Sequence, residues 1–134
     1  GTVPAKVHND LIDFSDFLPT CCEIANSSTD GLTLDGNSFL PQLHGETGNP
    51  RKFVYCWYNR DMEPGKTQVT ARNQRYKLYK SGKFYDVPND LQEKQPLTPD
   101  SLTPEQVAIK GDLQEVVEHY EQFDRLAQVI DGRQ

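Results

Sequence analysis

The sequence lacks the short motifs that mark many catalytic sites. It holds no glycine-rich phosphate loop, no HExxH pair and no GxSxG turn. Its three histidines, His8, His44 and His119, are scattered, and none stands in a short motif with a serine or cysteine nucleophile. The residues alone therefore predict no catalytic residue.

Cysteine is also scarce. Three cysteines cannot all pair within one chain, and the adjacent Cys21 and Cys22 lack the two-residue spacer of zinc-binding pairs. We expect Cys21, Cys22 and Cys56 to be free and mostly buried, because an unpaired cysteine behaves as a small hydrophobic residue. The Asp-Gly-Asn segment at 35–37 resembles part of a calcium loop, but no bidentate glutamate follows at the required offset. The sequence therefore predicts no metal site and no cofactor in this chain.

Acidic residues outnumber basic ones in this sequence. Lys and Arg total 14 against 20 Asp and Glu, which gives a net charge of -6 and a pI near 5.0. This balance argues against a nucleic-acid partner, because nucleic-acid binders concentrate Lys and Arg on one face. No apolar run approaches the roughly 20 residues that span a bilayer, and the start lacks the features of a signal peptide, so we expect no membrane partner. The chain opens on Gly1 without an initiator methionine, and we expect it to be a truncated piece.

The first fifty residues predict one short helix and an irregular link. Apolar residues from 11 to 25 follow helical spacing, which favours an amphipathic helix over roughly 16–26. Ser15 is the expected N-cap, and Pro19 falls in or just after the first turn, where a missing N–H costs least. Turn-forming residues then dominate from 27 to 50, and this stretch is predicted to be irregular.

The middle of the chain predicts a sheet. The run KFVYCWY at 52–58 is rich in β-branched and aromatic residues, as is typical of strands. Three further strands are expected at 66–72, 75–80 and 83–87. Because the intervening reversals are short, the pairing should be antiparallel.

A long helix is predicted to begin at Pro104. Thr103 and Gln106 form a capping box around it. An apolar stripe with a 3.6-residue period should lie on the sheet, comprising Val107, Leu113, Val116, Val117, Tyr120, Phe123, Ala127 and Ile130. Gly111 predicts a break or kink between Lys110 and Asp112. The expected fold is thus α+β, a four-stranded antiparallel sheet packed against a long C-terminal helix, preceded by a short N-terminal helix and an irregular link.

Four phrases in order resemble the C-terminal region of the sulfatase family, a branch of the alkaline-phosphatase-like superfamily. They are DFLPTCCEIA at 16–25, LDGNSFLPQLHG at 34–45, RNQRYKL at 72–78 and FYDVPNDLQE at 84–93. The sequence departs from the family pattern at Leu91, where proline is frequent, and at 95–97. The resemblance implies that residues 1–50 end a sulfatase catalytic domain and that residues 51–134 form the C-terminal subdomain.

The resemblance also implies what the parent protein would need. A complete sulfatase hydrolyses sulfate esters with a formylglycine made from a Cys or Ser in a C/S-x-P-x-R motif, and it binds calcium. None of the three cysteines fits that motif, so no catalytic residue is assigned here. The implied partners are the missing catalytic domain and a sulfated small molecule or glycan. Relatives suggest a periplasmic or secreted parent, and a related hydrolase of phosphate or phosphonate esters is an alternative.

Four residues are candidate substrate contacts. Aromatic faces stack on sugar or aryl rings and arginine pairs with anions, which points to Tyr58, Arg60 and Tyr79, and loop residue His44 is the fourth. A rival hypothesis is a free-standing carbohydrate-binding or interaction module that uses Trp57, Tyr58 and Tyr79 as a platform.

The N-terminal helix predicts an interaction surface. Four apolar side chains point in more directions than one small sheet can cover, namely Leu11, Phe14, Phe17 and Leu18. We therefore expect an exposed apolar patch that packs against the missing domain. In its absence, the fragment should form a homodimer through this helix or displace its N-terminus.

Overall fold

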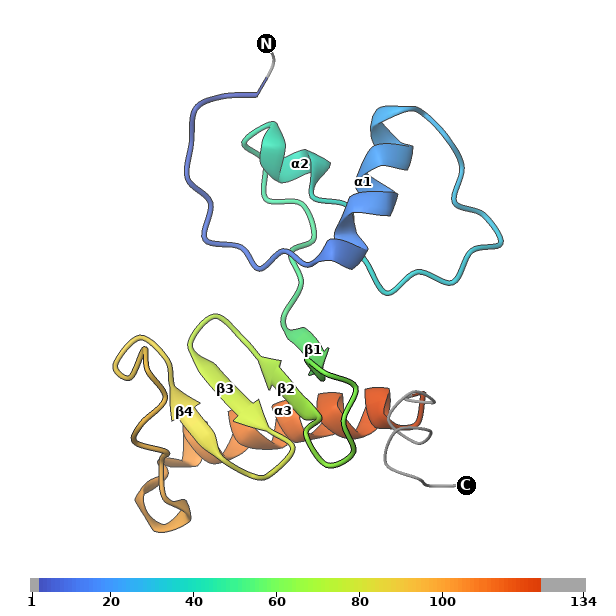
Figure 1. Cartoon of the computed structure of the whole chain (residues 1–134). Helices are drawn as coiled ribbons and strands as arrows, with labels where there is room; N and C mark the ends of the chain where they lie inside the picture. Colours follow the sequence, from blue (N-terminus) through green and yellow to red (C-terminus); the bar gives the residue numbers. More distant parts are fainter. Residues whose placement is uncertain (1–2, 124–134) are drawn as a thin grey trace. The chain divides into compact units, whose positions relative to one another are not determined.

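A computed structural model of the chain describes residues 3–123 (Figure 1). The chain divides into two compact units, Gly1–Val54 and Tyr55–Gln134. Among the described residues, no helix combines the length and apolar character needed to cross a bilayer.

The first unit is built around a short helix near its start. A 3-10 turn, η1 (Phe14–Asp16), leads into α1 (Phe17–Ile24), so the predicted N-terminal helix is confirmed. The prediction of Ser15 as its N-cap is wrong. Asp13 caps the preceding turn instead, since its Oδ1 accepts a hydrogen bond from the Phe14 amide at 2.7 Å and its own amide donates to Asp16 Oδ2 at 2.8 Å. The reciprocal pair of aspartates satisfies the free amides, and the cap lies two residues earlier than expected.

The first unit contains a second helix that was not predicted from the sequence. The stretch 27–50 was predicted to be irregular, but α2 (Leu40–Leu43) forms within it. Pro41 lies in its first turn, where a missing N–H costs least, and Ser38 Oγ accepts from the Leu40 amide at 3.2 Å. The helix is one turn long, which is too short for a periodic signal.

A buried ion pair ties the parts of the first unit together. Asp16 is 2% exposed, and its carboxylate accepts from Arg51 Nε at 2.8 Å and from a second nitrogen of the same guanidinium. The Asn37 amide also donates to Asp16 Oδ1 at 2.8 Å. Thr20 Oγ1 donates to the Asp16 carbonyl at 2.7 Å and accepts from the Phe39 amide at 3.1 Å. These bonds fasten the irregular link to α1.

The second unit contains the predicted sheet. Its strands are β1 (Val54–Tyr58), β2 (Gln68–Arg72), β3 (Tyr76–Tyr79) and β4 (Phe84–Asp86), in the order β1-β2-β3-β4. In the β2–β3 and β3–β4 pairs, which are antiparallel, Ala71 lies opposite Leu78, and Leu78 lies opposite Phe84. The predicted four-stranded antiparallel sheet is confirmed. Each observed strand is one to two residues shorter than predicted at one or both ends.

Helix α3 (Pro104–Glu121) covers one face of this sheet and packs on β2 and β3 (Figure 1). Its predicted capping box is present, because Thr103 Oγ1 accepts from the Gln106 amide at 3.2 Å and Gln106 Oε1 accepts from the Thr103 amide at 2.9 Å. The core between helix and sheet consists of Val69, Ala71, Tyr76, Leu78, Phe84, Leu113 and Val117. The α+β prediction is confirmed.

Parts of the predicted apolar stripe do not reach the sheet. Val107 is 55% exposed, and Phe123, which follows the end of the helix, is 66% exposed. The buried face is carried by Leu113 and Val117, and Tyr120 extends it by stacking on Tyr55 with 4.7 Å between ring centroids. The helix packs on β2, β3 and the Tyr55 ring, and this contact surface is smaller than the predicted apolar stripe. Ala127 and Ile130 lie outside the described residues.

The cysteines are free, as expected, but they are not buried. Cys21 and Cys56 are exposed, and Cys22 is half-buried. In α1 the buried side is marked by Thr20 rather than by the cysteines, because Thr20 takes part in the hydrogen bonds around Asp16. On β1, Cys56 shares the exposed side of the strand with Tyr58, two residues on.

The predicted break at Gly111 is wrong, because α3 continues through this residue without interruption. A Cβ added at Gly111 would meet nothing within 4 Å. We expect Gly111→Ala to raise the free energy of unfolding by about 1 kcal/mol, since alanine loses less backbone entropy in a helix. Urea denaturation followed by circular dichroism would measure the change.

A matched control is Gly82→Ala in the turn between β3 and β4. An added methyl group at Gly82 would also meet open space, but the φ of this residue is +86°, which L side chains rarely adopt. This substitution should lower stability. A destabilised Gly111→Ala variant would contradict the open helical environment of Gly111.

Candidate functional site

The candidate site lies on the face of the sheet opposite α3, which we call the outer face. Antiparallel register places Thr70 beside Tyr79, Arg72 beside Lys77 and Lys77 beside Tyr85 on this face. These residues alternate along their strands with the core residues that face the helix. The outer face is therefore polar and aromatic, while the other face is apolar.

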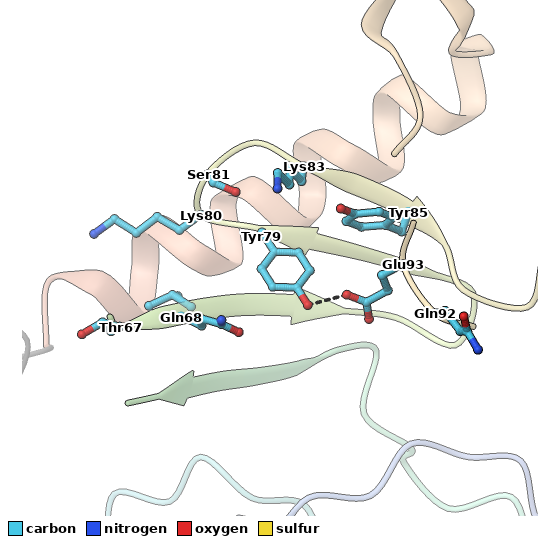
Figure 2. Close-up of a pocket in the computed structure, with 10 residues that line it drawn as sticks. Thr67, Gln68, Tyr79, Lys80, Ser81, Lys83, Tyr85, Gln92 and Glu93 are labelled. Carbon is cyan, nitrogen blue, oxygen red and sulfur yellow. Dashed lines mark hydrogen bonds between the residues drawn. The ribbon is translucent and has the colours of Figure 1, made fainter. Parts of the chain in front are cut away.

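A groove of about 680 Å³ opens on the outer face, and we refer to it as the outer-face groove. Figure 2 shows the Tyr79 ring between Gln68 and Tyr85, with its hydroxyl directed at Glu93. The rings of Tyr79 and Tyr85 meet edge to face, with 5.9 Å between centroids. The described residues that line the groove are Thr67, Gln68, Val69, Tyr79, Lys80, Ser81, Lys83, Tyr85, Gln92 and Glu93.

Three polar side chains form a hydrogen-bonded cluster at the groove. Lys77 Nζ donates to Glu93 Oε1 at 2.7 Å and to Tyr79 Oη at 3.0 Å, and the Tyr79 hydroxyl donates to Glu93 Oε2. Glu93 comes from the connector after β4 and has a φ of +52°, unusual for a residue with a side chain. The cluster fastens this connector to β3 and fixes the orientation of the Tyr79 ring.

The protonation states follow from these contacts. Burial disfavours the Glu93 carboxylate, but hydrogen bonds from Lys77 and Tyr79 outweigh it and lower the pKa of Glu93. Burial also opposes the charge on Lys77, yet its bonds to Glu93 and Tyr79 raise the pKa of Lys77. Burial and the bond to Glu93 raise the pKa of Tyr79. At neutral pH the cluster is an ion pair plus a neutral tyrosine, so Tyr79 is a donor and not a general base.

The four predicted contact residues lie in different places. Tyr79 lines the groove. Tyr58 ends β1 and is 53% exposed, and Arg60 is exposed in the following loop, with its Nε 3.8 Å from Asp61 Oδ1. His44 is the C-cap of α2 and belongs to the first unit. Among the described lining residues Tyr79 alone was predicted, and the substrate roles of all four stay predictions.

The aromatic platform of the rival hypothesis is not favoured. Trp57 and Tyr58 are consecutive on β1, so their side chains point to opposite faces of the strand. The indole Nε1 of Trp57 is buried, whereas Tyr58 is exposed. The two rings therefore do not form one platform with Tyr79.

Lys83, Tyr85 and Glu93 line the groove, and Lys77 bonds to the lining residues Tyr79 and Glu93, but none of the four was predicted as a site residue. Lys77 and Glu93 do stand in the third and fourth sulfatase-like phrases, and that was the available signal. Metal binding finds no support among residues 3–123, since no three of their His, Cys, Asp or Glu side chains are grouped to hold an ion. The arrangement can orient and bind a ligand.

An α+β unit with an antiparallel sheet, a covering helix and a polar groove is the kind of domain that these observations define. No family model matches the chain. Over 52 residues it is 42% identical to the ulvan-active sulfatase of Formosa agariphila, an alignment that covers 39% of this chain and 10% of that protein. The resemblance to sulfatases is thus confirmed over these 52 residues, which are a small part of that protein.

Solved structures agree with this resemblance at the level of the fold. A 2-O GAG sulfatase superposes with a TM-score of 0.58 and 24% identity, covering 78% of this chain and 23% of that one. A sulfatase homologue from Bacteroides thetaiotaomicron gives a TM-score of 0.57 at the same identity and coverage. The chain therefore corresponds to about a quarter of these structures.

Proposed function

We propose that the chain is a C-terminal fragment of a sulfatase, a sulfuric ester hydrolase, and that it stabilises the catalytic domain and borders its substrate cleft. The observation that carries this proposal is the 42% identity to a sulfatase over 52 residues. A sulfatase structure shares the fold of 78% of this chain, and the shared region is 23% of that structure. This match supports the proposal that the chain is one part of such an enzyme. The segments 1–50 and 51–134 would then be the end of the catalytic domain and the subdomain itself.

The stabilising role draws support from an apolar surface on the first unit. Phe14 is 89% exposed, and Phe17 and Leu18 are each 51% exposed. The Phe14 and Phe17 rings stack at 5.8 Å, and Phe17 meets Phe39 edge to face at 5.4 Å. Clustered apolar side chains of this kind mark surfaces that pack against another protein part. The missing part of the catalytic domain is the proposed occupant, and self-association is the alternative for the isolated fragment.

The role at the cleft draws support from exposed contact residues. Tyr58 and Arg60 are accessible, Tyr79 lines the outer-face groove, and His44 caps α2. The relatives are described as active on ulvan and as a 2-O GAG sulfatase. A sulfated glycan is accordingly the proposed substrate of the parent, with formylglycine and calcium supplied by the catalytic domain.

The isolated chain is expected not to hydrolyse sulfate esters. Its cysteines are followed by Cys-Glu-Ile, Glu-Ile-Ala and Trp-Tyr-Asn, and none matches the formylglycine motif. Positioning without a nucleophile or a metal gives no turnover. Release of a chromogenic phenol from an aryl sulfate, with calcium added, would be the assay. Turnover by contaminant-free protein would contradict the expectation.

A chimera tests the proposed role directly. In the Formosa agariphila enzyme, the C-terminal region would be either deleted or replaced by this chain. We expect the deletion to lose soluble yield and sulfate release, and the replacement to recover both. A deletion that works as well as the whole enzyme, or a replacement that behaves like the deletion, would refute the proposal.

A further inference from the structure

Among residues 3–123, one cation that lines the outer-face groove has no carboxylate partner. Lys77 pairs with Glu93 at 2.7 Å, and Lys80 pairs with Glu121 at 2.5 Å. Lys83, which is exposed, makes no ion pair with any residue from 3 to 123. Within residues 3–123, Lys83 is therefore the one lining cation whose charge no carboxylate neutralises.

The rest of the lining suits a hydroxyl-rich ligand. Two exposed amides, Gln68 and Gln92, can each donate and accept, and Thr67 and Ser81 add hydroxyl groups at the rim. The half-buried Tyr79 ring is held by its bond to Glu93, so little side-chain entropy is lost when a ligand packs on it. Amides around an aromatic ring are a suitable set for a sugar.

We propose that the outer-face groove binds a pyranose ring that carries one anionic substituent, either a sulfate or a carboxylate. The ring packs on Tyr79, its hydroxyls bond to Gln68 and Gln92, and the anion contacts Lys83. One lining cation without a carboxylate partner among residues 3–123 is too few for a polyphosphate, and the polar lining disfavours an apolar ligand. This inference rests on the proposed sulfatase function only for its biological setting, since the binding itself belongs to this chain.

The test is an NMR titration of the 134-residue chain with a 2-O-sulfated heparin disaccharide. We expect weak binding, with a Kd on the order of 1 mM, and amide shifts at Gln68, Tyr79 and Lys83. Lys83→Gln should weaken binding about three- to tenfold, as for loss of one charged contact. The matched control is Lys52→Gln, which makes the same charge change at an exposed lysine of the first unit and should leave binding unchanged.

Three further ligands distinguish whether Lys83 contacts a sulfate or a carboxylate of the sugar. The unsulfated disaccharide keeps its uronate carboxylate, so equal affinity would assign the carboxylate to Lys83 and weaker binding would assign the sulfate. A neutral disaccharide should bind the wild type about as weakly as the sulfated one binds Lys83→Gln. Inorganic sulfate should bind more weakly than the sulfated disaccharide, because it lacks the ring.

Several results would overturn the proposal. They are an absence of shifts up to about 10 mM disaccharide, equal weakening by Lys52→Gln, or inorganic sulfate binding as tightly as the sugar. The amide spectrum of each variant reports its folding, so an unfolded variant is recognised. Saccharide binding with a failed chimera would refute the proposed function alone, and a working chimera without saccharide binding would refute this inference alone.

Discussion

Replacing Asp16 with alanine is expected to lower the stability of the first unit by about 3–5 kcal/mol, because the buried ion pair between Asp16 and Arg51 would be broken. The side chains of Arg51 and Asp16 are only 8% and 3% exposed. The same substitution removes the acceptor for the Asn37 amide. Since whole domains are stable by roughly 5–15 kcal/mol, this loss should unfold much of the unit.

Amide hydrogen exchange at Asn37 and Phe39 would measure the effect, because these amides bond to the Asp16 and Thr20 side chains. Asp35→Ala removes an exposed carboxylate from the same unit, and it should change stability by less than about 0.5 kcal/mol. An equally small effect of Asp16→Ala would contradict the buried ion pair.

The Asp16 contribution should also depend on pH. Burial opposes the carboxylate, but hydrogen bonds from Arg51 and from the amides of Asp13 and Asn37 outweigh burial and lower the pKa of Asp16. A lowered folded-state pKa means that the stabilisation is fully present above the unfolded value of about 3.9 and is lost as the pH falls through the folded value. The stability difference between wild type and Asp16→Ala should therefore be constant near neutrality and shrink in acid.

Gly36→Ala is expected to destabilise the first unit about as much as Asp16→Ala does, by a different mechanism. A Cβ at Gly36 would lie 1.9 Å from the Ser15 carbonyl oxygen and 2.8 Å from the Asp16 nitrogen. Both are backbone atoms, so relief requires the link to move away from η1 and break the Asn37–Asp16 bond. The cost should reach about 3 kcal/mol or more, at the high end for overpacking.

Gly31→Ala provides the comparison for this variant. Gly31 has a φ of +80° and nothing within 4 Å of the added Cβ, so its penalty of about 1 kcal/mol comes from backbone strain alone. Trp57 fluorescence during urea unfolding would show whether the second unit stays folded. Wild-type exchange protection at Asn37 in Gly36→Ala would show that the close approach does not exist in solution.

Regular elements could be predicted from the sequence because their signals are local. Alternating side chains and short turns predicted the sheet, and the Thr103–Gln106 capping box predicted the start of α3. The groove could not be predicted in this way. It depends on Glu93 reaching back across 16 residues to Lys77, and on the left-handed backbone at Glu93 that makes this reach feasible.

The wrong predictions also concern features that depend on contacts outside the local pattern. Phe123 continues the helical period in the sequence, yet the helix ends before it, and Ser15 was a good capping residue in isolation, but Asp13 and Asp16 cap each other. The three cysteines were expected inside on hydrophobicity alone. Local patterns therefore predicted which elements form, while long-range partners determined which side chains they bury.

The bond between Lys77 and Glu93 also has an evolutionary consequence. A lysine kept without its acid, or an acid kept without its lysine, would leave a half-buried charge unpaired beside Tyr79. Selection should therefore act on the two positions jointly, although 16 residues separate them in the chain. Across homologous sequences, the residues at 77 and 93 are expected to covary, and swapping both charges together should be tolerated better than reversing either one.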